Sequence, residues 1–453
     1  MSLEDQAEYE SKFYWLDLEG DYESSFRNGW RPDPYGEAVI PVGLCTYMCT
    51  SEEMYEREVQ RRLSRFEIKA SSRPPKADRN LAIKEFRRSA VGSECSRALN
   101  LRPWSVLQRT LHHLLLDICL KHDDWMYICD FVFDRLKAVR QDMIIQRIEG
   151  RRYIEILEGS VRFLVYSMYR LTCTLKDYTT IQSTYKPLLT PAGTPLSGLD
   201  NYEINVVREM KLTMQCLRDC LQSLLVQYHD FVPDSPNRAL FEAMNLIVNI
   251  PILPEHCLQR TDASDFIQLC STNRVLSVVF KMYIEHLTGN HLAAMNNLPK
   301  LQEYPLIIMA YAPVIAQIQL HLVAVIKKTH ASRGPSKTHP NNLTKLICPE
   351  WLDQSADERF IFTIFMAIQF GIFDEADDLI SFCIKPNDVK PPARPRNFYE
   401  KAEIIRATNM ATAAEHESET RAYAMQMLAA RNWSFFTETL KIYGVESILD
   451  PSR

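Results

Sequence analysis

The feature that most constrains the fold is an amphipathic stripe between residues 204 and 228. Its apolar side chains recur every three or four residues, at Ile204, Val207, Met210, Met214, Leu217, Leu221, Leu224 and Tyr228. Because an α-helix repeats every 3.6 residues, this spacing predicts one long helix that buries a single face. A face of this length needs other elements to cover it.

The rest of the chain repeats this helical periodicity. Thr50 and Glu53 form a capping-box pattern that starts a helix at 52–67, and helical segments follow at 103–120, 125–148 and 151–176. Shorter helices continue to about Lys328. The alternation typical of strands is rare, and glycine is scarce, with 13 residues in 453. These observations predict an all-α fold arranged as a helical-repeat solenoid, although no sequence period repeats.

Shifts in composition divide the chain into five segments. Residues 1–40 form an acidic arm, whose first 25 residues carry eight acids, one lysine and several aromatics. Residues 41–102 form a basic segment, in which thirteen basic residues face six acidic ones from Glu56 to Arg102. The arm could fold back onto that segment or bind a partner.

The remaining three segments are separated by Pro- and Gly-containing stretches. A helical domain spans 103–330 and is interrupted by a linker at 187–200. Two helices broken at Gly371, followed by a Pro-rich piece that suits a β-hairpin, predict a small winged-helix module at 331–398. A final helix, beginning near Tyr399, dominates residues 399–453.

Net charge and cysteine usage restrict the classes of function. A net charge of −5 limits any nucleic-acid contact to a local surface. The twelve cysteines include no C-x-x-C pair and no secretory signal is recognised, which indicates reduced thiols in the cytosol or nucleus. The uncharged run 306–326 is long enough for a membrane span, but its proline, glutamines and histidine favour a buried core helix.

The sequence lacks the motifs of several enzyme classes. It contains no G-x-G-x-x-G or G-x-x-x-x-G-K-[ST] phosphate loop, no G-x-S-x-G elbow and no H-E-x-x-H helix. His113 and Asp117 have a spacing that metals use, but helix caps and solvated faces explain such acids better. Cys45 and Cys49 admit half of a metal site, a redox pair or a hinge, and no second ligand pair with zinc-finger spacing follows. We predict no catalytic centre, cofactor or metal.

Four segments, in order, carry a resemblance to a known family. They read "VGLCTYMCTSEEMYERE" (42–58), "AIKEFRRSAVG" (82–92), "LRPWSVLQRTLHHLL" (101–115) and "DFVFDRLKAVRQDMIIQ" (130–146). Together they resemble the Sac-three/GANP domain family across about residues 41–385, with Thr50 where proline is usual and Phe86 in place of tyrosine. The motif positions are Gly43, Cys45, Met48, Cys49, Glu56, Arg57, Glu58, Arg88, Ser89, Gly92, Leu101, Arg102, Pro103, Asp134, Arg135, Arg140, Gln141, Asp142 and Gln146.

The resemblance implies a PCI-like array of helical repeats capped by a winged helix, and a scaffold rather than an enzyme. Large members organise the TREX-two complex at the nuclear pore with a second PCI-domain subunit and a small acidic protein, and they help mRNA leave the nucleus. A short member is tied instead to centrosome duplication and spindle assembly in cell division. We expect a nuclear role in mRNA export; the alternative is a role in the cytoplasm, at the centrosome and spindle.

Within the family, the first segment is a structural hook, so the resemblance implies that Cys45, Met48 and Cys49 are apolar plugs. The polar set of the fourth segment is expected to bond neighbouring helices, with partner contact as the alternative. It lies beside a buried stripe made of Val132, Leu136, Val139 and Met143.

Two further groups are weighed as binding surfaces. Basic side chains that suit contact with RNA or with a protein partner are Lys84, Arg87, Arg88, Lys327, Lys328, Arg333, Lys337 and Lys345. Trp433, Phe436 and Leu440 share one helical face, which suits docking onto the solenoid or insertion into the groove of centrin.

Overall fold

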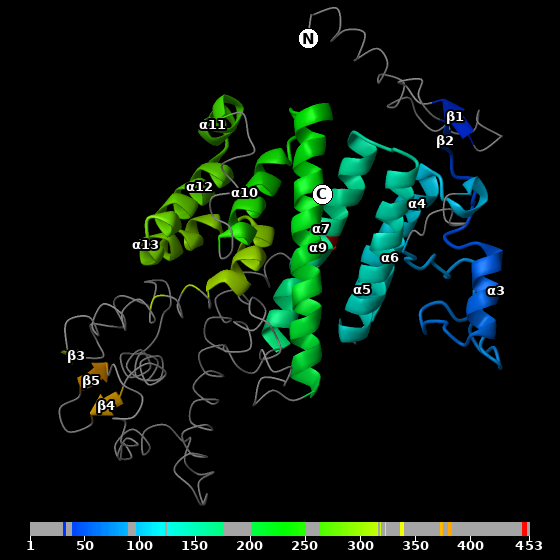
Figure 1. Cartoon of the computed structure of the whole chain (residues 1–453), viewed down its shortest axis with the longest axis horizontal. Coiled ribbons are helices and arrows are strands. Elements are labelled where there is room, and N and C mark those ends of the chain that lie inside the picture. Colours follow the sequence, from blue (N-terminus) through cyan, green and yellow to red (C-terminus); the bar gives the residue numbers. More distant parts are fainter. Residues whose placement is uncertain are drawn as a thin grey trace, which may run out of the picture. The chain divides into compact units, whose positions relative to one another are not determined.

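Figure 1 shows a chain built mainly from helices. The computed structural model describes residues 30–32, 39–88, 97–122, 125–174, 201–250, 263–315, 318, 322, 336–338, 372–374, 379–382 and 446–450. Within these ranges the strands are confined to two small sheets, so the predicted all-α class is confirmed. The chain divides into two compact units, the first comprising 1–164, 219–238 and 445–453 and the second 165–218 and 239–444.

The first unit begins with a strand pair and continues as helices. β1 (Trp30–Pro32) pairs antiparallel with β2 (Val39–Pro41), and α3 (Ser51–Val59) follows. The 3-10 turn η3 (Ala98–Asn100) precedes α4 (Trp104–His112), which continues as the π-helical η4 (His113–Ile118) and as α5 (Cys119–Lys121). Next come α6 (Trp125–Ile145) and α7 (Arg151–Thr174), and the short α19 (Glu446–Leu449) packs beside η4. The helices predicted at 103–120, 125–148 and 151–176 are therefore present.

The helix predicted at 52–67 is shorter than expected. Thr50 caps it as predicted, since its Oγ1 accepts the backbone N–H of Glu53 at 3.2 Å. A capping box would also direct the Glu53 carboxylate back to the backbone of Thr50. Here this carboxylate accepts the N–H of Glu85 at 2.8 Å. The helix ends at Val59 because Arg61 adopts a φ of 55°, a left-handed conformation that does not continue an α-helix.

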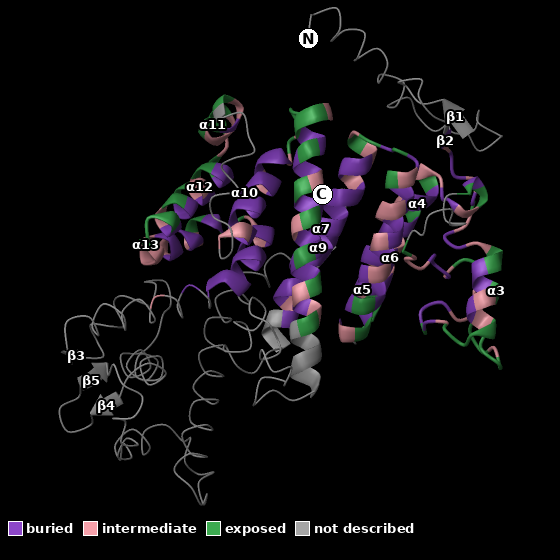
Figure 2. Ribbon diagram, viewed as in Figure 1, coloured by how far each residue is buried: buried purple, intermediate pink, exposed green. Residues whose placement is uncertain are grey.

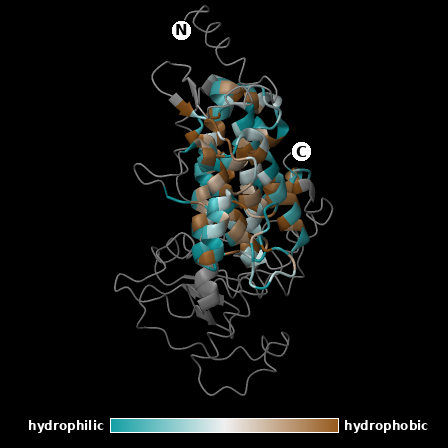
Figure 3. Cartoon of the chain, turned by 90° about the vertical axis from the view of Figure 1, so that its right-hand side faces the viewer, coloured by the Kyte–Doolittle hydropathy of each residue, from teal (hydrophilic) through white to brown (hydrophobic). Residues whose placement is uncertain are grey.

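The predicted stripe on α6 lies in the core of the first unit. Val132, Leu136, Val139 and Met143 are all buried. In Figure 2 the described part of α7 is almost wholly buried, whereas α9 (Asn201–Phe231) alternates buried and exposed bands. Figure 3 shows hydrophobic and hydrophilic patches side by side along the described helices, as amphipathic packing requires.

Helix α9 runs from the second unit into the first, and its six described stripe members, from Met210 to Tyr228, are buried. The helical series continues in the second unit. The elements that follow are α10 (Arg238–Asn249), α11 (Ala263–Thr272), α12 (Arg274–Leu287), α13 (His291–Asn296), the 3-10 turn η5 (Leu298–Leu301) and a helical run at 305–315. Consecutive helices pack on one another, α11 on α12 and α12 on α13.

The run at 306–326 was tested as a possible membrane span. Its residues 306–315 are buried core. Among the described residues, no helix is both long enough and apolar enough to cross a bilayer.

The predicted second helix after Gly371 is wrong. Ile372–Asp374 (β4) and Leu379–Phe382 (β5) form an antiparallel hairpin, and Ser336–Thr338 (β3) pairs with the other edge of β5. β4 and β5 each contain an isoleucine and a phenylalanine, and the acidic stretch between these two strands suits a turn better than a helix interior. The helices of the predicted winged-helix module lie outside the described residues, so that module stays a prediction.

Candidate functional site

The first motif segment is fixed by its backbone. The N–H groups of Leu44 and Cys45 donate to the carbonyls of Ala98 and Leu101, both at 2.9 Å, and the N–H of Gly43 donates to Oε1 of Gln146 at 2.7 Å. A Cβ added at Gly43 would lie 2.6 Å from the carbonyl carbon of Arg102. The glycine is therefore required by a close approach of two backbones.

The two cysteines of this segment are buried side chains. Cys49 is 1% exposed, and its Sγ accepts a hydrogen bond from Arg57 at 3.3 Å. Burial raises the pKa of the Cys49 thiol to about 12, so it stays protonated at neutral pH. Within the described ranges, no group of three or more His, Cys, Asp or Glu side chains is placed to hold a metal ion. Cys45 and Met48 are buried as well, so all three side chains pack inside the protein as the resemblance implies, although both sulfhydryl groups also make a hydrogen bond.

A buried ion cluster links α3, the loop after it and α6. Arg57 and Glu67, both with fully buried side chains, form a bidentate pair at 2.8 Å. Arg135 of α6 reaches the same carboxylate at 3.3 Å and Glu85 at 3.4 Å. The N–H of Ile83 donates to Glu67 at 2.9 Å. Because every charge has an opposite partner, the cluster holds together three segments that are distant in sequence.

A second buried cluster is centred on Asp142. Its carboxylate accepts from Nζ of Lys84 and from Nε of Arg102, both at 2.7 Å. Lys84 also donates to the carbonyl of Asn100 at 2.7 Å. Gln146, which directly follows α6, donates to the carbonyl of Arg102 at 2.9 Å and accepts the N–H of Gly43. The four motif segments therefore meet on one face of α6.

The expectation that Lys84 contacts RNA or a partner is wrong. Lys84 is only 4% exposed, and its ammonium group is paired with Asp142. An RNA phosphate could therefore reach Lys84 only by breaking a buried ion pair. Arg87, by contrast, pairs with Glu56 at the surface, and Arg88 is exposed.

The remaining motif residues also serve contacts within the first unit. Arg140 of α6 donates to Sγ of Cys220 on α9, and Gln141 donates to the carbonyl of Arg87 at 2.8 Å. Glu58 accepts the N–H of Ala77 at 2.7 Å. Asp134 accepts from Arg135 of the same helix, Leu101 is buried, and Pro103 directly precedes α4.

Several predicted positions lie outside the described residues. They are Ser89, Gly92, Lys327, Lys328, Arg333, Lys345, Trp433, Phe436 and Leu440. Lys337 lies in β3, where it is paired with Ser381 of β5.

Sequence reasoning missed the acids at the centre of the first cluster. Glu67 and Glu85 lie among basic residues, in the segment onto which the acidic arm was expected to fold. The sequence did contain one signal for Glu67. An isolated glutamate in a basic run, between the apolar residues Phe66 and Ile68, favours a buried ion pair.

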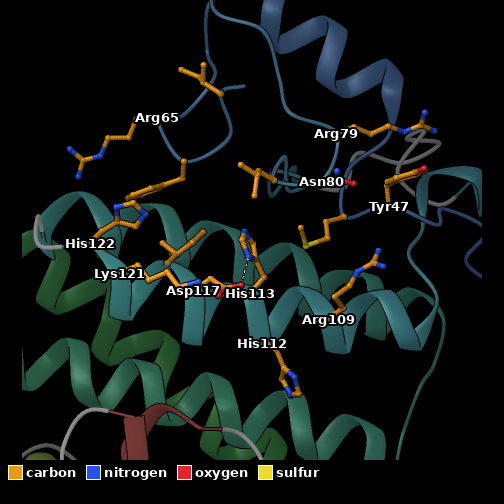
Figure 4. A pocket seen from close by; sticks show the side chains of 15 residues that line it. Tyr47, Arg65, Arg79, Asn80, Arg109, His112, His113, Asp117, Lys121 and His122 are labelled. Carbon is orange, nitrogen blue, oxygen red and sulfur yellow. Dashed lines mark hydrogen bonds and ion pairs between the residues drawn. The ribbon is translucent and has the colours of Figure 1, made fainter. Parts of the chain in front are cut away.

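A pocket of about 670 Å³ lies beside the Cys45–Cys49 segment. Tyr47 and Met48 line it on one side, the loop 65–81 on another, and α4, η4 and α5 form its floor. Figure 4 shows Arg65 and Arg79 on opposite sides of the opening, with Tyr47 and Arg109 on the side of Arg79.

Asp117 is the one carboxylate in this lining, and it is already engaged. Its oxygens lie 2.5 Å from Nζ of Lys121 and 2.8 Å from Nδ1 of His113. These hydrogen bonds, that of Lys121 above all, hold the pKa of Asp117 below its usual value. The aspartate therefore stays ionised and neutralises only part of the surrounding positive charge.

Comparison with known proteins gives the motif segments a family. The model of the SAC3/GANP family matches residues 48–185, a stretch that contains both buried ion clusters. Residues 48–185 of this chain therefore match a SAC3/GANP domain. The match confirms the predicted resemblance over a shorter range than 41–385. SAC3/GANP is a scaffold-type family.

Three curated relatives share part of this chain. SAC3 family protein 1 of Schizosaccharomyces pombe is 32% identical over 169 residues, which is 36% of this chain and 16% of the relative. SAC3 family protein B of Arabidopsis thaliana is 28% identical over 155 residues, covering 34% and 8%. Protein xmas of Drosophila melanogaster is 24% identical over 221 residues, covering 46% and 9%. The matches thus span less than a fifth of each relative's own length.

Proposed function

We propose that this chain is a non-catalytic scaffold that takes part in nuclear mRNA export, as a component or relative of the TREX-two complex at the nuclear pore. In this role it pairs with a PCI-domain subunit and a small acidic protein. Centrosome duplication and spindle assembly remain the alternative, to be separated by the partners that the protein retains.

The observation that supports a scaffold is that charged residues of the family-matched stretch 48–185 pair with one another inside the protein. Arg57 and Arg135 both pair with Glu67 inside the first unit, and Lys84 pairs with Asp142. Buried charges arranged in this way fix the geometry of segments instead of presenting a reactive group to a substrate. A rigid surface of this kind is what a subunit that positions other subunits requires.

The test is affinity purification of the tagged protein from dividing cells, followed by mass spectrometry of the retained proteins. We expect a PCI-domain subunit, a small acidic protein and nuclear-pore proteins. Centrin, spindle or pericentriolar proteins in their place would support the centrosomal alternative and contradict the export role.

A matched pair of variants on α6 makes the result specific. Asp142→Ala removes the centre of the second buried cluster, whereas Asp130→Ala removes an exposed carboxylate from the same helix. The partners should be lost with the first and kept with the second, because they recognise the folded motif surface. Equal retention by both variants would show that binding does not depend on this domain.

A further inference from the structure

The pocket beside the Cys45–Cys49 segment combines an apolar interior with a cationic rim. Met48, Phe66 and Ile118 are buried apolar residues of its lining. The rim carries the exposed side chains of Arg65, Arg79, Arg109 and Lys121. With Asp117 as its one acid, the lining has four permanent positive charges against one negative. A ligand that matches this surface needs an apolar group between several acids.

The arginines of the rim are held in place by the protein. Arg79 stacks over the Tyr47 ring at 3.9 Å, and Arg65 lies over the Tyr127 ring at 4.2 Å. Arg109 donates to the carbonyl of Thr46 at 3.0 Å. Stacking occupies one flat face of the Arg79 guanidinium, whose N–H groups can still donate along its edge to a carboxylate. Binding would therefore cost little side-chain entropy.

The pocket suits a peptide better than a nucleic acid strand. Proteins bind single-stranded RNA by stacking its bases on accessible aromatic side chains along a basic groove. Here the Phe66 ring already packs against His122, Tyr127 and Phe131, with centroids 4.6–5.3 Å apart, and the Tyr47 ring is covered by Arg79. A volume of about 670 Å³ accommodates one or two large side chains.

The same chain contains a segment of this chemistry. Residues 1–25 carry eight acids and one lysine, and they include Tyr9, Phe13, Tyr14 and Trp15. These residues lie outside the described part of the structure. We propose that the pocket is a binding site for an acidic peptide with aromatic side chains, and that its occupant is the first 25 residues of the acidic arm. This assignment goes beyond the scaffold role and does not depend on it.

The attachment of the arm makes this contact sterically accessible. Pro41 precedes Tyr47 by six residues, which limits their separation to about 20 Å. Trp30 pairs with Pro41 across the β1–β2 ladder, which adds about 5 Å. The arm therefore leaves the fold within about 25 Å of Tyr47, a distance that about eight extended residues cover. Tethering also raises the local concentration of the arm, so modest affinity is enough.

Carbodiimide cross-linking of the full chain tests the proposal. The reagent joins a carboxylate to an amine in contact with it, and Lys121 is the one lysine in the lining of the pocket. Mass spectrometry should find Lys121 joined to acids of the arm, together with its known neighbour Asp117, which serves as the internal reference. The yield of the arm product should fall as salt is raised, because exposed charges are screened.

Two double variants with the same change in charge provide the control. Arg79→Glu with Arg109→Glu reverses the rim, while Lys69→Glu with Lys76→Glu reverses exposed charges that lie outside the pocket lining. At equal melting temperature, we expect the first to lower the arm product about tenfold and the second to change it by less than about twofold.

Four outcomes would overturn the proposal. The first is that Lys121 joins only Asp117. The second is that both double variants lose the arm product equally. The third is that mixing labelled and unlabelled protein yields products between two copies, which would make a second molecule the occupant. The fourth is that the rim variant loses binding of a single-stranded RNA probe while no arm product forms, which would assign the pocket to RNA.

Discussion

Asp142→Ala is the substitution that should disturb the family domain most. Its carboxylate is fully buried and holds both Lys84 and Arg102, which are themselves buried. Removing one partner of a buried ion pair costs about 3–5 kcal/mol, because the remaining charge is left without compensation. Lys84 keeps a bond to the carbonyl of Asn100, so we expect about 4 kcal/mol rather than twice the single-pair cost.

Hydrogen exchange measured by mass spectrometry locates this loss. The amides of Gly43, Cys45 and Lys84 donate to Gln146, Leu101 and Met48. A loss of about 4 kcal/mol predicts that their protection falls by about a thousandfold, since each 1.4 kcal/mol is a factor of ten. The exposed Asp130→Ala on the same helix should leave it unchanged.

A second substitution separates a lost charge balance from a general defect. Adding Lys84→Met to Asp142→Ala removes one of the two stranded cations and should restore part of the protection. Protection in Asp142→Ala that differs from Asp130→Ala by less than about 1 kcal/mol would refute the argument, as would a double variant that is worse than the single one.

Three further predictions follow from other contacts. Arg140→Ala should lower stability by about 1–2 kcal/mol through the lost contact with Cys220, seen as a lower melting temperature; unchanged melting with lost partner binding would contradict a structural role. Gly43→Ala should cost about 3 kcal/mol in urea unfolding, because the new Cβ meets backbone. Gly159→Ala should cost less than about 1 kcal/mol, because its Cβ meets a flexible leucine side chain. Burial, aided by a neighbouring histidine, lowers the pKa of His286 to about 3. Stability is therefore intact above pH 6.5 and falls as pH drops toward 3, by about 2 kcal/mol at pH 5. His286→Gln should weaken that dependence in acid unfolding.

Helices with a periodic apolar face could be predicted from the sequence because burial repeats with the turn of the helix. This is why the stripes of α6 and α9 were found at the residues that the structure buries. The end of α3 and the β4–β5 hairpin were not found. Arg61 carries no sequence mark of its left-handed φ, and a short run such as Ile372–Asp374 is equally apolar in a strand or a helix.

The motif residues of the site were identified, but their partners were not. Arg135 and Asp142 belong to a recognisable segment, yet Glu67 lies 68 residues from Arg135, and Lys84 lies 58 residues from Asp142. Ion pairs between residues so far apart in the sequence cannot be predicted from a local sequence pattern. Lys84 was therefore grouped with Arg87 and Arg88 as a surface cation, although its burial is decided by an aspartate on a distant helix.

This pairing changes the meaning of the positive charge in the N-terminal segment. The excess of basic residues from Glu56 to Arg102 looks like one cationic surface in the sequence. In the structure Arg57, Lys84 and Arg102 face inward and are neutralised by buried acids, whereas Arg65 and Arg79 are exposed at the pocket. The number of basic residues in the sequence therefore overestimates the positive charge that an RNA strand could reach, because some of these residues are buried in ion pairs. Of the exposed charge that remains, Arg65 and Arg79 lie at an apolar pocket, where a ligand would make an anionic contact together with an apolar one.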